Sequence, residues 1–178
     1  MQEGLIIAIL TYVFIILSSV VIIQKNTKHY SHDFNRDWID YQRGFGSVNE
    51  KTFWIGLDQI HQLTKTGSYS LEVVLKQYGV TKIVKWRSFM IGNESQKYRL
   101  SISGFDAGSS GLRDCIRNQN GMYFTTRDKD NDRESSRNCA NYYGGSAWWF
   151  KACYYSNLNA LKYGGSYYDE TTMILKRY

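Results

Sequence analysis

Proline is absent from the 178 residues of this chain, so Gly, Asn, Asp and Ser must form its turns. Low-complexity segments and internal repeats are also absent, as are the HExxH, P-loop and dinucleotide-binding motifs. No serine–histidine–acid arrangement is visible, and the three histidines lie far in sequence from the main group of carboxylates. These absences predict a protein that is not an enzyme.

The charged residues show no clustering of one sign. The 22 Lys and Arg residues exceed the 16 Asp and Glu residues, for a net charge of +6, but the basic residues are interspersed with acidic ones. No arginine-rich arm, recognition helix or zinc-finger spacing is present, so we expect no nucleic-acid partner. The length and the 43% hydrophobic content are typical of one globular domain.

One long apolar run lies near the N-terminus. Leu5–Ile23 is 19 residues long, carries no charge and is long enough to cross a bilayer. It predicts a signal-anchor over residues 1–24 that would attach the protein to a membrane, followed by a linker at 25–33. A cleaved signal peptide is the alternative, because Ser18 and Ser19 provide small residues near the end of the run.

Alternation of apolar and polar residues predicts a sheet in the first half of the remaining chain. We expect a short helix at 57–64, where Ile60 and Leu63 share one side, and strands that include 69–75, 82–91 and 98–102. Residues 104–120 are rich in Gly, Ser and Asn and predict a loop region. Asn93 begins an Asn-Glu-Ser sequon and is a candidate glycosylation site on a surface loop.

Carboxylates at every second position mark the stretch 121–161. Asp128, Asp130 and Asp132 are a candidate site for a hard cation such as Ca²⁺, which prefers oxygen ligands. An EF-hand is excluded, because Arg133 occupies the position that requires glycine and Cys139 the position that requires glutamate. A solvated turn without metal remains open, since four bases accompany four acids and exposed pairs contribute only about 0–1 kcal/mol each.

Several ordered sequence blocks resemble the fibrinogen C-terminal domain family, which includes fibrinogen chains, ficolins, tachylectins, angiopoietins and tenascins. The blocks are Phe34–Gly46, Phe53–Thr64, Tyr98–Leu100, Asn120–Thr126, NCA at 138–140, AWW at 147–149, Cys153 and SNLN at 156–159. The resemblance implies an α+β domain over residues 34–178, N-terminally truncated relative to the family. A central twisted antiparallel sheet with short helices would carry a loop-rich calcium and ligand subdomain at about 104–178.

The same resemblance implies the covalent and metal sites. Cys139 and Cys153 would form a disulfide, which requires an oxidising compartment and therefore an extracellular domain. Asp130 and Asp132 would bind Ca²⁺ through their side chains, and backbone carbonyls near Glu134 and Ser136 would complete the shell. Asp128 would support them. Cys115 matches no family cysteine and would be a free thiol or an intermolecular link.

A ligand pocket is implied beside the disulfide. The family typically has a cis peptide bond before the second cysteine, here Ala152–Cys153. Tyr143 and Tyr167 would contribute apolar walls for the acetyl group of N-acetylated sugars, and Tyr154 replaces a family histidine. We expect Trp148, Trp149 and Phe150 to be core residues.

These implications lead to an extracellular, calcium-binding recognition module. Its ligands would be glycans or acetylated groups, as in lectin-like innate recognition. The alternatives are adhesion or receptor engagement through a cell-surface or matrix protein, and a truncated form without function. Homo-oligomer formation is compatible with the unpaired Cys115.

Overall fold

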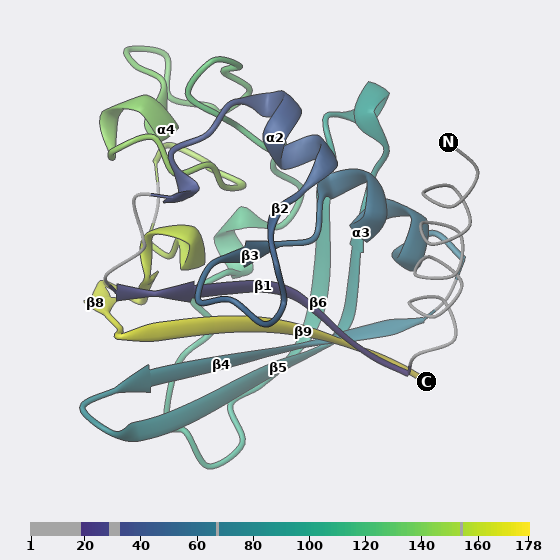
Figure 1. The fold of residues 1–178 in the computed structure, drawn as a ribbon, viewed down its shortest axis with the longest axis vertical. Coiled ribbons are helices and arrows are strands. Elements are labelled where there is room, and N and C mark those ends of the chain that lie inside the picture. The colour runs from purple at the N-terminus through teal and green to yellow at the C-terminus, as the bar shows by residue number, and fades with distance from the viewer. Residues whose placement is uncertain (1–18, 29–32, 67, 154) are drawn as a thin grey trace.

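Seven antiparallel strands form the central sheet of the computed structural model, which describes residues 19–28, 33–66, 68–153 and 155–178 (Figure 1). The spatial order of the strands is β2-β3-β1-β9-β4-β5-β6. Their bounds are β1 Val20–Thr27, β2 Phe45–Gly46, β3 Phe53–Trp54, β4 Tyr69–Gln77, β5 Val80–Ile91, β6 Leu100–Asp106 and β9 Glu170–Arg177. The first and last strands in the sequence are therefore neighbours near the centre of the sheet.

Two helices cover one part of the sheet, α2 (Trp38–Arg43) and α3 (Leu57–Thr64) (Figure 1). The bounds of α3 confirm the predicted helix, whose Ile60 and Leu63 are buried. The alternation predicted at 69–75 is also confirmed, whereas the strand predicted at 98–102 begins only at Leu100. Tyr69, Leu71, Val73 and Leu75 of β4 are all buried on the face that packs into the core.

Strand β1 corrects the predicted N-terminal boundary. Val20–Ile23 belong to the apolar run and residues 24–27 to the predicted linker, yet together they form an interior strand between β3 and β9. Ile23 is fully buried, and a register shift between Ile22 and Gln24 marks a bulge. The folded domain therefore begins well before residue 34, and a 19-residue membrane segment ending at Ile23 is wrong at its C-terminal end.

The rest of that predicted segment, residues 1–18, lies outside the described residues. Within the described ranges, no helix is both long and apolar enough to cross a membrane.

The loop-rich half of the molecule comprises residues 107–169, and the remaining described residues form the sheet half. The loop-rich half contains α4 (Cys139–Tyr142), the small ribbon of β7 (Lys162–Tyr163) and β8 (Ser166–Tyr167), and the short 3-10 helices η3 (Arg117–Gln119) and η4 (Leu158–Ala160). The predicted subdomain at 104–178 was too wide at both ends. Strand β6 continues to Asp106, and β9 lies inside the central sheet.

An aromatic cluster joins the two halves. Phe124 is fully buried and its ring stacks on Trp54 of β3 with centroids 5.9 Å apart. The Phe124 ring also makes a T-shaped contact with Trp149 at 4.9 Å, and the Trp54 and Trp149 rings are 6.4 Å apart. Trp148, Trp149 and Phe150 are at most 1% exposed, which confirms that they are core residues. The indole nitrogens of Trp148 and Trp149 donate to Gln119 Oε1 and the Tyr98 carbonyl, so both are satisfied.

Candidate calcium loop and ligand-binding pocket

The candidate calcium loop is organised by its own carboxylates. Asp132 Oδ1 accepts a hydrogen bond from the Glu134 amide at 2.7 Å, and Oδ2 accepts one from the Cys139 amide at 2.8 Å. Asp130 Oδ1 accepts from the Asp132 amide at 3.2 Å. Each carboxylate oxygen has two lone pairs, so these bonds orient the carboxylates and leave capacity for a cation.

The electrostatics of the loop fit a positive ion. Burial raises the pKa of Asp132, and the neighbouring Asp130 carboxylate raises it further, although two backbone amides act in the opposite direction. A cation would remove both the repulsion and the cost of burying the charge. Among the described residues no three His, Cys, Asp or Glu side chains form a metal-binding cluster. Backbone carbonyls would therefore have to complete a calcium shell around Asp130 and Asp132.

Glu134 and Ser136 are paired with each other. The Ser136 hydroxyl and amide both donate to Glu134 Oε1, at 2.7 and 3.1 Å, and these bonds hold the pKa of Glu134 below its usual range. Their side chains thus stabilise the turn.

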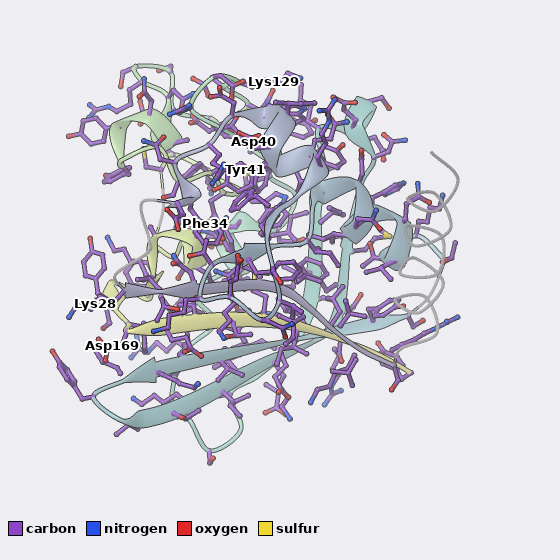
Figure 2. The ribbon with its side chains drawn as sticks, viewed as in Figure 1. Lys28, Phe34, Asp40, Tyr41, Lys129 and Asp169 are labelled. Atoms are coloured by element: carbon purple, nitrogen blue, oxygen red, sulfur yellow. A yellow bond between two sulfur atoms is a disulfide. The ribbon has the colours of Figure 1, made fainter. Side chains whose placement is uncertain are left out.

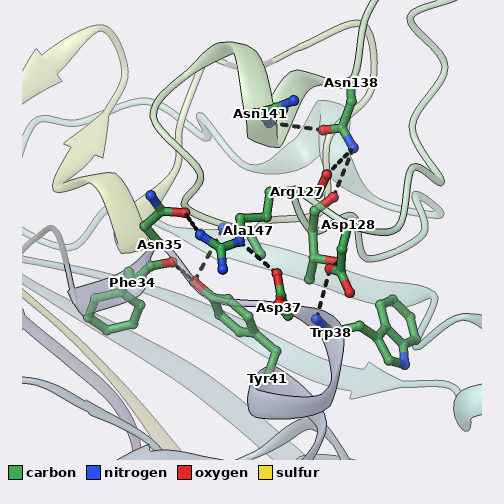
Figure 3. A network of polar contacts seen from close by, with 11 residues as sticks. Phe34, Asn35, Asp37, Trp38, Tyr41, Arg127, Asp128, Asn138, Asn141 and Ala147 are labelled. Atoms are coloured by element: carbon green, nitrogen blue, oxygen red, sulfur yellow. Dashed lines mark hydrogen bonds and ion pairs between the residues drawn. The ribbon is translucent and has the colours of Figure 1, made fainter.

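Asp128, the third alternate carboxylate, has a structural role (Figure 3). Its Oδ1 accepts hydrogen bonds from the Trp38 amide at 2.9 Å and from the Thr126 hydroxyl at 2.6 Å. The side chain of Asp37, the N-cap residue of α2, makes no capping bond, and its Oδ1 instead accepts from Arg127 Nε at 2.6 Å. Residues 127 and 128 therefore fasten the start of helix α2 to the calcium loop.

A continuous set of bonds connects the calcium loop to the segment 151–153. Asp132 holds the Cys139 amide, and Cys139 is joined to Cys153 by the predicted disulfide, with Cα atoms 5.1 Å apart. The Cys153 amide donates to Cys139 Sγ, and the Arg133 amide donates to the Lys151 carbonyl at 2.8 Å. The position of Lys151–Cys153 is therefore coupled to the conformation of the carboxylate loop.

The predicted cis bond is wrong. No peptide bond between described residues is cis, so Ala152–Cys153 is trans. The chain instead changes direction at Cys153 itself, which has a φ of +56°. Few residues other than glycine adopt this left-handed region, and the disulfide and the Cys153 amide bond hold it in place.

A hollow of about 400 Å³ lies beside the disulfide. The residues that line it come from the segments 115–119 and 151–155; they are Cys115, Asn118, Gln119, Lys151, Ala152, Cys153 and Tyr155. It combines an ammonium group, side-chain amides and an exposed ring. Burial raises the pKa of the Cys115 thiol, and Asp114 adds to the effect, so this thiol is held in its protonated form.

The predicted ligand residues do not assemble around this hollow. Cys153 lines it, but neither Tyr143 nor Tyr167 lines any of the described hollows. Tyr143 follows α4 and its ring contacts that of Tyr142, whereas Tyr167 lies in β8. Tyr154 lies outside the described residues.

Sequence reasoning missed Asn118, Lys151 and Tyr155. Lys151 and Tyr155 each stand two positions from Cys153, so proximity to the second cysteine was the available signal. No comparable signal marks Asn118.

Comparison with known proteins agrees with this architecture. The family model described as "Fibrinogen beta and gamma chains, C-terminal globular domain" matches residues 18–176. The fibrinogen-like globe domain of human ANGPTL6 is 28% identical, with a TM-score of 0.79 over 88% of this chain and 77% of that one. The corresponding domain of human ANGPTL2 is 29% identical, with a TM-score of 0.78 over 88% and 79% of the two chains.

A lamprey fibrin D-dimer is a more distant match among the solved structures. It is 27% identical with a TM-score of 0.73, over 88% of this chain and 61% of that one, and was solved with the peptide Gly-His-Arg-Pro-amide.

Proposed function

Since this chain belongs to the family of fibrinogen C-terminal globular domains, we propose that it is an extracellular recognition module that binds a peptide segment of a partner protein. The ligand would enter the hollow beside the Cys139–Cys153 disulfide, and Ca²⁺ in the loop 130–136 would fix the shape of one wall. No catalytic step is required of it.

The coupling between the calcium loop and the segment 151–153 supports this proposal. The Arg133 amide holds the Lys151 carbonyl, and the disulfide holds Cys153. A cation bound by Asp130 and Asp132 would therefore order the residues that line the hollow. Calcium on extracellular modules typically binds with a Kd of about 0.1–1 mM. At millimolar calcium such a site adds roughly 1 kcal/mol of stability.

The composition of the hollow supports a peptide ligand. Asn118 and Lys151 offer hydrogen-bond donors to peptide carbonyls or a carboxylate, and Tyr155, 60% exposed, offers an apolar ring. The lamprey relative, which shares the fold, was solved with a peptide bound.

An acetylated glycan is the second candidate ligand. An acetamido group has a polar amide and an apolar methyl. In the same hollow, Asn118 offers a side-chain amide for the polar part, and Ala152 and the Tyr155 ring offer apolar surface for the methyl. Neither Tyr143 nor Tyr167 lines this hollow, which disfavours the acetyl slot expected from the sequence.

Localisation outside the cell rests on the disulfide, because such bonds persist in oxidising compartments. With β1 occupying Val20–Ile23, Leu5–Ser19 is the part of the apolar run left over, and 15 residues match the core of a signal peptide. N-terminal sequencing of the secreted protein would test this: a start near residue 19 agrees, and an intact Met1 in a membrane fraction contradicts it.

Calcium titration by calorimetry tests the metal part of the proposal. The wild-type protein should bind Ca²⁺ saturably at about 0.1–1 mM, and an Asp130→Asn/Asp132→Asn variant should not. The control is Asp40→Asn/Glu50→Gln, which removes the same charge from the sheet half. Equal binding by both double variants would contradict the assigned ligands.

A peptide-display selection in calcium, repeated in EDTA, tests the ligand. Peptides that lose binding in Lys151→Gln and in EDTA support the proposal. Enrichment on an acetylated-sugar resin without any peptide would instead favour the second candidate.

A further inference from the structure

The hairpin between β4 and β5 has an unusual residue in its turn. Gln77 pairs with Val80, so Tyr78 and Gly79 alone make the turn, and their φ angles are +49° and +76°. Turns of this kind favour Asn-Gly, because both positions require the left-handed region. A tyrosine there costs roughly 1–2 kcal/mol of backbone strain.

Burial does not compensate for that strain. The side chain of Tyr78 is 86% exposed, the largest exposure among the large hydrophobic residues that the structure describes as exposed. A hydrogen bond instead stabilises the turn, because the Tyr78 amide donates to Asp169 Oδ2 at 2.9 Å. Asp169 lies beside the hairpin and also faces Lys28 at 3.7 Å (Figure 2). The backbone is thus fixed while the ring points to solvent, an arrangement that neither folding nor packing explains.

Two adjoining hollows lie next to this ring. The smaller, of about 210 Å³, is lined by Gln77, Tyr78, Val80, Lys82 and Tyr168. The larger, of about 420 Å³, shares Val80 and Lys82 with it and extends along β5 to the hydroxyl-bearing loop at 108–110. Together they form the hairpin groove, which lies along β5 and reaches residues of the loop-rich half, and which shares no lining residue with the disulfide hollow.

The hairpin groove contains a cation without a counterion. The Lys82 backbone pairs with Leu75 in the β4–β5 ladder, but its ammonium group makes no hydrogen bond or ion pair with any residue that the structure describes, although Lys82 lines both hollows. Lys85 also lines the groove and lies 3.2 Å from Glu72, a carboxylate that Lys176 shares at 2.9 Å. Asp106 is the acidic residue that lines the groove, and its Oδ1 already accepts from the Gly108 amide. The free positive charge therefore lies at the junction of the hollows.

We propose that the hairpin groove binds an acidic saccharide chain. The exposed ring of Tyr78 would stack on the apolar face of a sugar, and Lys82 would pair with its carboxylate or sulfate. Thr81 and Ser109 line the same groove, and their hydroxyls would offer hydrogen bonds to sugar hydroxyls. Lysine is depleted at the core of protein–protein interfaces, so its central place here favours an anionic sugar over a protein surface.

Immobilised heparin, polysialic acid and neutral dextran, probed with the full chain over a series of salt concentrations, test this proposal. Binding to an acidic chain, absent on dextran and weakening with salt, is expected. Heparin and polysialic acid distinguish sulfate from carboxylate recognition. EDTA should leave this binding unchanged, which separates the groove from the calcium-dependent site.

Two variants and two matched controls locate the site. Tyr78→Asn and Lys82→Gln should each weaken binding by about tenfold or more. Tyr123→Asn and Lys65→Gln change an exposed tyrosine and an exposed lysine elsewhere and should bind as the wild type does. Because asparagine suits the turn, Tyr78→Asn should also raise the melting temperature by about 2–4 °C, so weaker binding cannot result from unfolding.

Three results would overturn the proposal. They are no binding to either acidic chain, equal losses in Lys65→Gln and Lys82→Gln, and a Tyr78→Asn variant that binds normally. Loss of a protein partner in Tyr78→Asn, with no saccharide binding in the wild type, would assign the groove to a protein instead.

Discussion

The two halves of this molecule achieve order by different means. The sheet half is stabilised mainly by backbone ladders and by alternating buried side chains. Strand β4 is an example, because it pairs with β5 on one side and with β9 on the other. In the loop-rich half, side chains replace the ladder: Asn138 Nδ2 donates to the Thr126 carbonyl while its Oδ1 accepts from the Asn141 amide (Figure 3). The loop conformations of the loop-rich half therefore depend on individual polar side chains and one disulfide, so single substitutions there can change them.

Removal of the Phe124 ring should destabilise both halves of the molecule together. Its buried ring contacts both Trp54 of the sheet half and Trp149 of the loop-rich half, so Phe124→Ala should cost about 3–5 kcal/mol. Denaturant unfolding should still be a single transition, at lower denaturant. Phe124→Leu, which retains apolar volume, is the milder control. Two separated transitions would show that the halves fold independently.

Removal of the disulfide should affect the halves unequally. Replacement of Cys139 and Cys153 by serine should cost about 3 kcal/mol, the value for a loop of some 15 residues. Hydrogen exchange should accelerate at 130–155 more than in β4 and β9. Uniform acceleration throughout the chain would contradict this, and Cys115→Ser serves as the control.

Glu72 offers a test confined to the sheet half. Burial alone would raise the pKa of Glu72, but hydrogen bonds from Lys176 and Lys85 outweigh it and hold the pKa below the usual value. A lowered carboxyl pKa stabilises the fold above the unfolded-state pKa of about 4.3, and the contribution is lost as pH falls through the lower folded-state pKa.

Glu72→Gln should therefore cost roughly 1 kcal/mol at pH 7. Its stability should converge with that of the wild type in acid. A difference that persists undiminished at pH 2 would mean that packing, not charge, distinguishes the variant. Glu50→Gln, on an exposed turn, is the matched control.

The smallest expected effect is at Asn93. Its Oδ1 accepts from the Gln96 amide and caps the short helix η2 (Glu94–Gln96), so Asn93→Ala should cost about 1 kcal/mol. The residue is exposed, as a glycosylation site must be. Secreted wild-type protein should lose mass on treatment with an N-glycosidase, and Asn93→Ala should not. If the mass of the wild-type protein does not change on this treatment, the predicted glycosylation of Asn93 is wrong.

Local patterns predicted the sheet half well, and long-range geometry limited the rest. Helix α3 and the buried face of β4 follow from residues close together in sequence. Strand β1 was missed because Val20–Ile23 continue an apolar run, and its remaining buried residues include the polar Gln24 and Asn26.

The candidate site was predictable only in part. The Cys139–Cys153 disulfide and the core tryptophans followed from ordered blocks in the sequence. The role of Asp128 at helix α2 depends on a contact between residues 90 apart in sequence, and the residues that line the hollow come from two separate loop segments. No local pattern encodes those contacts.

The central position of β9 has a consequence for how the protein forms. The partners of the β1–β9 ladder are 143 to 156 residues apart in sequence, and β9 also separates β1 from β4. Pairings of such long range close slowly. They cannot begin until β9 has left the ribosome, so β1 and β4 stay unjoined until then. A polypeptide that stops before Glu170 cannot join β1 to β4, and the cell would meet it as an incomplete chain with two open sheet edges.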